Sequence, residues 1–209
     1  MVSICTFKQD YLDFQSKKTE TFPCDVKCIE DKDRCLFHNE NYLKGSNYPE
    51  NKDKVIEKLQ ERIENSKKNK TPLKCIGYYL PDITLNKEEF TQQVYFNHCK
   101  FQKADFSMAT FKETADFSRT TFSSEADFSR TTFSSEADFS KTIFNDAVNF
   151  TRAKFSNESY FSGKFKGTTS FNYSTFEKPN ESRFEVEDMS MVSFLNTDIT
   201  QIRFSDNIV

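Results

Sequence analysis

The chain has 209 residues, a formal net charge of −3 at pH 7, four glycines and no tryptophan. Its length fits one or two domains. The start, MVSICTFKQD, lacks the apolar core of a secretory signal, and no apolar run is long enough to span a bilayer, so we expect a cytoplasmic protein without a membrane segment. So few glycines also argue against a glycine-rich phosphate loop.

The first forty residues hold four of the six cysteines and one of the two histidines. The candidate metal ligands in this region are Cys5, Cys24, Cys28, Cys35 and His38. In a cytosolic chain such clustering favours a metal over disulfides. Zinc takes four thiolate or imidazole ligands, and a bound ion would explain how a short polar segment folds. On spacing alone, Cys24, Cys28, Cys35 and His38 would serve as the four ligands, and a set of free thiols is the alternative.

We therefore predict a zinc module over residues 1–48, with a structural ion because four protein ligands leave no position for water. Residues 39–49, which overlap the end of this module, should form a linker. Residues 52–69 are rich in lysine and glutamate and should form one helix within a segment spanning 49–71. Its apolar stripe consists of Val55, Ile56, Leu59 and Ile63. We expect this helix to cap the unpaired strand edge of the domain that follows, and a partner-binding helix is the alternative.

The apolar run CIGYYLP at 75–81 is expected to form the first strand of a domain over residues 72–209. Cys75 and Cys99 should be thiols of the core, and His98 should point outward. Neither histidine is then free to pair with a nucleophile, so no catalytic arrangement is expected.

Residues 115–125 read ADFSRTTFSSE, and residues 126–136 repeat these letters without change. Phenylalanine recurs at intervals of five or six residues, with one interval of four, through most of the chain after residue 94: 96, 101, 106, 111, 117, 122, 128, 133, 139, 144, 150, 155, 161, 165, 171 and 176. A small residue usually lies two positions before each. This period fits neither an α-helix nor an ordinary strand, and it predicts a solenoid.

One large and one small side chain, two residues apart, should point inward on each short extended segment. The interior would then be a stack of phenylalanine rings beside small residues. After a break at 177–181 the large positions resume every five residues: Phe184, Met189, Phe194, Ile199 and Phe204. Glu187 is the one residue out of character at an inward small position.

The repeat resembles the pentapeptide-repeat family, whose loose pattern A-(D/N)-(L/F)-x-x appears here as Ala126-Asp127-Phe128-Ser129-Arg130. The likeness covers about 94–204. It implies an all-β solenoid, a right-handed four-sided β-helix of pentapeptide-repeat type, here with the Cys/His module and the capping helix before it. The sixth residue in alternate units should widen corners or form bulges. If four units close one coil, Phe106 should stack on Phe128, and Phe117 on Phe139, 22 residues apart.

The sequence Cys35-Leu36-Phe37-His38 also resembles the end of small Cys/His modules that precede such repeats in some microbial proteins. That resemblance implies Cys5, Cys24, Cys35 and His38 as the ligands, with Cys28 a spare thiol.

Two functions are then considered. The first is a non-enzymatic scaffold that binds a protein partner of unknown identity. The second is DNA mimicry, because some relatives bind type II topoisomerases such as gyrase by imitating duplex DNA. Residues 91–209 hold 16 Asp and Glu against 13 Lys and Arg, which argues against both mimicry and direct nucleic-acid binding. Columns of Asp in the repeats should be offset by neighbouring columns of Arg and Lys, as solvated faces.

The C-terminal end offers no cap after Phe204. Its last coil would expose apolar side chains and an unpaired strand edge. We expect a homodimer through this coil, as the resemblance also implies, with a longer natural chain as the alternative.

Overall fold

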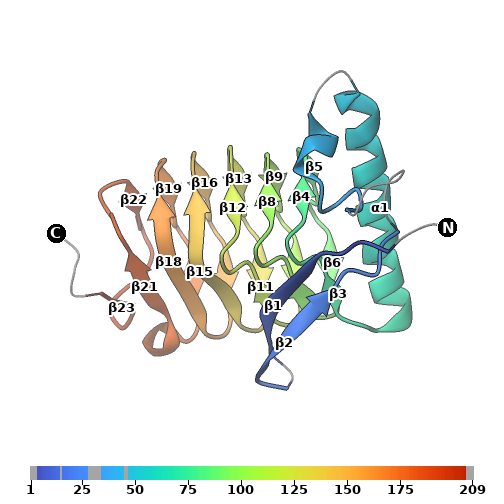
Figure 1. Cartoon of the computed structure of the whole chain (residues 1–209). Helices are drawn as coiled ribbons and strands as arrows, with labels where there is room; N and C mark the ends of the chain where they lie inside the picture. Colours follow the sequence, from blue (N-terminus) through green and yellow to red (C-terminus); the bar gives the residue numbers. More distant parts are fainter. Residues whose placement is uncertain (1–3, 15, 28–33, 45–46, 206–209) are drawn as a thin grey trace.

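Short parallel strands stacked in four rows form the body of the protein (Figure 1). The computed structural model describes residues 4–14, 16–27, 34–44 and 47–205. The chain winds through about six turns, and each turn visits four faces in the same order. The predicted all-β solenoid is therefore confirmed.

The four faces are numbered in the order in which the chain reaches them. The first face contains β3 Leu73–Lys74, β7 Val94–Tyr95, β11 Ala115–Asp116, β15 Ala137–Phe144, β18 Ser159–Phe165, β21 Arg183–Val186 and β23 Arg203–Phe204. The second face contains β4 Tyr79–Leu80, β8 Lys100–Phe101, β12 Thr121–Phe122 and the later parts of β15 and β18.

The third face contains β5 Ile83–Thr84, β9 Ala104–Asp105, β13 Ala126–Asp127, β16 Val148–Asn149, β19 Thr169–Ser170 and β22 Val192–Ser193. The fourth face contains β6 Glu89–Phe90, β10 Thr110–Phe111, β14 Thr132–Phe133, β17 Lys154–Phe155 and β20 Thr175–Phe176. A short 3₁₀ turn, η2 (Pro179–Glu181), marks the predicted break.

The core is a set of parallel stacks of phenylalanine rings. Phe128 is fully buried, with its ring centroid 5.0 Å from that of Phe106 and 5.0 Å from that of Phe150. Phe117 and Phe139 stack in the same way, with planes 3° apart. The register pairs residues 22 apart through the middle coils, so both predicted ring stacks are confirmed.

The corners explain why units of five and six residues alternate. Three residues separate Phe122 from Ala126, where β12 ends and β13 begins, so the additional residue lies in a wide corner and the four faces remain. The tight corner after Phe128 instead places Arg130 in the left-handed region, with φ 57°. Thr131 follows, and its Oγ1 donates to the Phe106 carbonyl one coil earlier at 2.8 Å. This hydrogen bond satisfies a buried hydroxyl, which accounts for threonine at small inward positions.

Helix α1 (Tyr48–Asn69) covers the N-terminal end of the solenoid (Figure 1). Val55, Leu59 and Ile63 are buried and join the core, as predicted, whereas Ile56 is only partly buried. The helix begins four residues before the predicted Lys52, because proline is tolerated in the first turn of a helix, where its missing N–H is not needed. The predicted linker at 39–49 contains the first two residues of α1 and a 3₁₀ turn, η1 (Glu40–Leu43).

Two further expectations about the solenoid are wrong. Residues 75–81 do not form one strand, since a turn at Gly77, with φ 71°, separates β3 from β4 and makes them two sides of the first coil. Near the other end, Glu187 does not occupy the inward position that was expected for it. Strand β21 continues two residues past Phe184, so Val186 points inward and Glu187 stays exposed beside Lys164.

The N-terminal region contains an antiparallel hairpin that the sequence analysis did not predict. Its strands are β1 (Lys8–Asp13) and β2 (Lys18–Pro23). The hairpin lies against the side of the solenoid near its N-terminal end (Figure 1). Only a few of its side chains are buried, among them Tyr11, Asp13 and Phe22, which is too weak an alternation to identify the strands from sequence.

Candidate metal centre

Four of the five predicted ligands meet in one buried cluster. The Sγ atoms of Cys5, Cys24 and Cys35 and a ring nitrogen of His38 all lie within 4.8 Å of one another. All four residues are at most 6% exposed. This is the ligand set that the resemblance implies. Cys28, which spacing alone would also allow as a ligand, lies outside the described residues.

The hairpin positions two of these ligands. Cys5 lies just before β1 and Cys24 directly follows β2. The Cys24 N–H donates to the Phe7 carbonyl at 3.2 Å, and the Cys5 N–H donates to the Val26 carbonyl at 3.1 Å. These bonds extend the pairing of the hairpin, so the two cysteines enter the cluster side by side.

A tight turn and the first coil position the other two ligands. The His38 N–H donates to the Cys35 carbonyl at 3.1 Å, which brings both side chains to the same point. The His38 ring stacks on Phe7 with centroids 3.7 Å apart, and its Nε2 lies 2.9 Å from the Ile76 carbonyl oxygen. A carbonyl only accepts, so Nε2 donates to it, and Nδ1 is the ring nitrogen that faces the sulfurs.

Three of the six distances between ligand atoms are close to those around a tetrahedral ion. Zn–S bonds of about 2.3 Å and Zn–N bonds of about 2.0 Å place neighbouring ligand atoms roughly 3.5–3.8 Å apart. Here Cys24 Sγ lies 3.6 Å from Cys35 Sγ, and His38 Nδ1 lies 3.3 Å from Cys35 Sγ and 3.7 Å from Cys5 Sγ. The cluster is thus close enough to hold a metal, with four protein donors and with the imidazole oriented by its contact with the Ile76 carbonyl.

The electrostatics favour a thiolate at Cys35. The hydrogen bond from Cys24 is the largest effect, and together with the contact to His38 it lowers the pKa of Cys35 to about 4 despite burial. The same hydrogen bond, followed by burial, raises the pKa of Cys24. Since the thiolate is the form that binds metal, the lowered pKa of Cys35 favours metal binding by its sulfur.

Cys75, Cys99 and His98, the other described cysteines and histidine, do not belong to the cluster. Cys75 and Cys99 are buried core thiols, as predicted, and the Cys99 thiol donates to the Cys75 carbonyl. His98 occupies a corner with φ 58°, beside a groove of about 380 Å³ that Arg119 and Lys141 also line. Burial, followed by Arg119, lowers the pKa of His98.

The aspartates of the repeat have a structural role that the sequence analysis missed. Asp105 lies beneath Asp127, as predicted. Each carboxylate accepts the backbone N–H two residues later, from Ser107 at 2.8 Å and from Ser129 at 2.7 Å. These Asx turns hold the corner that precedes the left-handed residue. The signal was the fixed Asp-Phe-Ser spacing, which was interpreted only as a solvated column.

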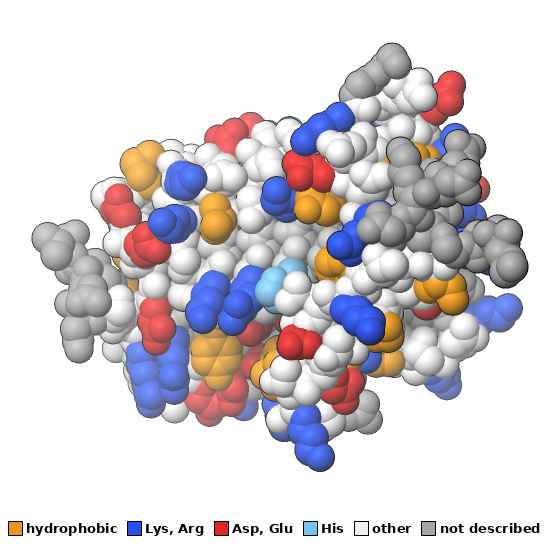
Figure 2. Space-filling model, in the orientation of Figure 1, with side chains coloured by type: hydrophobic (Ala, Val, Ile, Leu, Met, Phe, Trp, Pro, Cys, Tyr) orange, Lys and Arg blue, Asp and Glu red, His pale blue; other side chains and the backbone are white. Residues whose placement is uncertain are grey.

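Charges of both signs are interspersed over the solenoid. Figure 2 shows lysine and arginine side chains beside aspartate and glutamate side chains across the face in view. Several pairs link successive coils, such as Lys103 with Glu125 at 2.6 Å and Lys154 with Glu177 at 2.8 Å. In the described part of the chain, acidic side chains are therefore mixed with basic ones and do not form a separate acidic patch in the view of Figure 2.

Comparison with known proteins agrees with this architecture. Residues 89–132 match a family model described as pentapeptide repeats (9 copies). No curated protein and no solved structure matches the chain. No helix among the described residues has both the length and the apolar character needed to cross a membrane. The matched repeats and the stacked coils they form identify the chain as a pentapeptide-repeat protein.

Proposed function

We propose that this protein is a non-enzymatic scaffold that binds another protein through the third face of its solenoid. The observation that carries the proposal is a shallow groove of about 620 Å³ along this face. The residues that line it come only from the solenoid, from Lys103 in the second coil to Ser193 in the sixth. Neither the hairpin nor α1 contributes to it, so a partner could reach the whole row.

The side chains of this face are held in place before any partner binds. Asp127 and its upper neighbour Asn149 both accept the backbone N–H two residues later, at 2.7 Å and 3.0 Å. The hydroxyls of Thr151 and Ser170 lie 2.8 Å apart. Side chains that are already ordered lose little entropy on binding, which favours recognition by a rigid protein surface.

Mimicry of DNA towards a type II topoisomerase such as gyrase has less support. A mimic needs a continuous acidic surface. Glu125 on the third face is paired with Lys103, and the row continues from Asp127 to the neutral Asn149 and Ser170.

A matched pair of variants tests the binding face. Asn149 and Ser170 are neighbours on the third face, and Thr110 and Thr132 are neighbours on the fourth, all of them partly exposed. We expect Asn149→Lys with Ser170→Lys to reduce retention of the partner from an extract of the native source at least ~10-fold, a loss of about 1.4 kcal/mol. Thr110→Lys with Thr132→Lys adds the same charge and should leave retention unchanged. Equal loss in both double variants, or loss in neither, would contradict the proposal.

We further propose that Cys5, Cys24, Cys35 and His38 bind one structural zinc ion. The ligand-atom distances and the orientation of the His38 ring, whose Nδ1 faces the sulfurs, support this set. The ion would join the base of the hairpin to the turn that contacts the first coil, where the Tyr79 N–H donates to the Phe37 carbonyl at 2.8 Å. Thiolate ligands persist in a reducing compartment, which agrees with a cytoplasmic location.

For the C-terminal end we propose a two-fold homodimer, as expected from the sequence. Met191, Leu195 and Ile199 are 46%, 58% and 36% exposed at this end. In the described residues, β22 has a hydrogen-bonded neighbour only on the side of β19. A second copy would cover both the apolar side chains and the free strand edge.

Ile199→Asp is expected to convert a dimer into a monomer at micromolar concentration, because a carboxylate would be buried unpaired in the contact. Light scattering would measure the mass, and circular dichroism should show an intact solenoid. Met108→Asp is the control, since Met108 is also exposed, at 45%, but lies at a corner in the second coil. A wild-type chain that remains monomeric and in solution would refute the dimer.

A further inference from the structure

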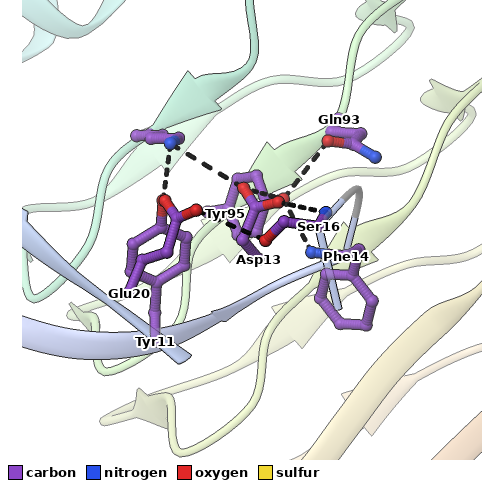
Figure 3. Close-up of polar contacts among 8 residues, drawn as sticks. Tyr11, Asp13, Phe14, Ser16, Glu20, Gln93 and Tyr95 are labelled. Atoms are coloured by element: carbon purple, nitrogen blue, oxygen red, sulfur yellow. Dashed lines mark hydrogen bonds and ion pairs between the residues drawn. The ribbon is translucent and has the colours of Figure 1, made fainter. Parts of the chain in front are cut away.

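The hairpin is joined to the first face by a buried polar network (Figure 3). The Tyr95 hydroxyl accepts the Phe14 N–H at 3.2 Å and lies 3.4 Å from Asp13 Oδ2 and 3.2 Å from Gln93 Oε1. The Tyr11 ring packs edge-on against the Tyr95 ring, with centroids 5.2 Å apart. Tyr95 is therefore the point on the solenoid to which the middle of the hairpin is attached.

The hairpin also reaches two coils further along the same face. Lys17 Nζ, in its turn, lies 3.9 Å from Glu136 Oε2. Leu12 lines two grooves that both include Asp138. Asp116 is the register partner of Tyr95 on one side and of Asp138 on the other. The hairpin thus crosses the position of Asp116, whose exposed fraction is 1%.

The chain contains a natural control for this burial. Asp116 and Asp127 occupy the same position in two repeats of identical sequence. Each accepts the backbone N–H of the serine two residues later, at 2.8 Å and 2.7 Å. Yet Asp127, on the third face, remains partly exposed. Since the local sequence is the same, the difference comes from the surroundings: Asp116 lies beside the large Tyr95 side chain on the face that the hairpin crosses, whereas Asp127 lies between Asp105 and Asn149.

The groups around Asp116 do not compensate a negative charge. Asp138 and Glu136 face it from the next coil, and the Tyr95 hydroxyl and the Cys99 thiol face it from the preceding coil. The hairpin brings Asp13 to Tyr95 and Lys17 to Glu136. Lys74, at the base of the same face, contacts Tyr11 and Asp13. His98, Arg119 and Lys141 line a groove on this face together with Leu12 and Asp138. Among the described residues no cation forms an ion pair with Asp116, so an ionised Asp116 under the hairpin would be both desolvated and repelled by its acidic neighbours.

We propose that the hairpin is a pH-sensitive cover of the first face, closed while Asp116 is protonated and loosened when Asp116 ionises. Lifting the hairpin would return Asp116 to the partly exposed state of Asp127, in which a carboxylate is solvated. The inference concerns the hairpin alone and holds whether or not the third face binds a protein.

The direction follows from proton linkage. Burial, followed by repulsion from Asp138, raises the pKa of Asp116 to about 8 in the closed state. A solvated aspartate has a pKa of about 4, so the closed state binds the proton more tightly than the open state. Rising pH therefore favours opening, by up to about tenfold per pH unit between these two values, and has no further effect above the higher one.

Hydrogen exchange of the β1 and β2 amides, corrected for the intrinsic rate, would measure the opening constant. In the wild-type protein we expect it to rise about 15-fold between pH 6.5 and pH 8 and then to level off after at most about a further twofold rise. Asp116→Asn keeps the side-chain acceptor for the Ser118 N–H and removes the ionisation, so its opening constant should stay flat and low. Asp127→Asn is the matched control and should follow the wild type.

Three outcomes would overturn the proposal. The first is a wild-type opening constant that is the same at pH 6.5 and pH 8. The second is an Asp116→Asn opening constant that rises as steeply as that of the wild type. The third is an opening constant that changes with the metal content of the samples and not with their pH. The first outcome is measured on the wild-type protein alone, so it tests the proposal even if a variant fails to fold.

Discussion

Replacing Phe128 by alanine is expected to lower the free energy of unfolding by about 3–5 kcal/mol. The Phe128 ring is fully buried between Phe106 and Phe150, each with its centroid 5.0 Å away. It also meets the edges of Phe117 and Phe139, both at 5.4 Å. A void in the middle of this stack could not collapse, because strand pairing holds the coils above and below at a constant spacing.

Arg130→Ala is the matched control, two residues further along the same repeat. The Arg130 side chain is exposed and its backbone is in the left-handed region, which arginine and alanine tolerate to a similar degree. We expect a loss of less than about 1 kcal/mol. Urea denaturation followed by circular dichroism would compare the two variants. Equal losses would mean that the inward and outward positions of the repeat are assigned wrongly.

Cys35→Ser is expected to reduce the zinc content of the purified protein from about one ion per chain to near zero. Cys35 is central to the cluster, since its sulfur contacts both Cys24 Sγ and His38 Nδ1. Structural zinc sites contribute about 10–16 kcal/mol of apparent binding free energy at pH 7, so loss of the ion should also unfold the base of the hairpin. Elemental analysis would measure the metal, and hydrogen exchange would measure protection of β1 and β2.

Two single variants decide which ligand set is real. Cys5→Ser should abolish zinc binding if the cluster holds the ion, whereas Cys28→Ser should leave it unchanged. The reverse result would favour the set expected from spacing alone. Protein purified without chelator that contains no metal would remove the basis for the zinc site altogether.

Much of the solenoid could be predicted because its repeat encodes its own geometry. A large and a small residue two positions apart, recurring every five or six residues, allow one short extended segment per unit. Stacking residues 22 apart then follows from closing a coil with four units, and the ring pairs of Phe106 with Phe128 confirm it. The core face of α1 was predictable for a similar reason, since Val55, Leu59 and Ile63 recur at helical spacing.

The metal cluster could be predicted only in part. Composition and the short sequence separation of Cys35 and His38 indicated a site. The spacing of the other cysteines along the chain does not show which of them completes the ligand set. Cys5 reaches the cluster because the pairing of β1 with β2 brings it beside Cys24, and that hairpin has too weak a pattern to be recognised from sequence.

The two identical repeats separate what sequence determines from what tertiary structure decides. Residues 115–125 and 126–136 have the same letters, and the sequence alone determined their shared features: a buried phenylalanine, an aspartate in an Asx turn and a left-handed arginine. Only the tertiary structure decided that Asp116 is buried and Asp127 is not. Successive units lie on different sides of the coil, and a hairpin more than 90 residues away in the chain covers the first face but not the third. Identical sequences therefore differ in their exposure to solvent.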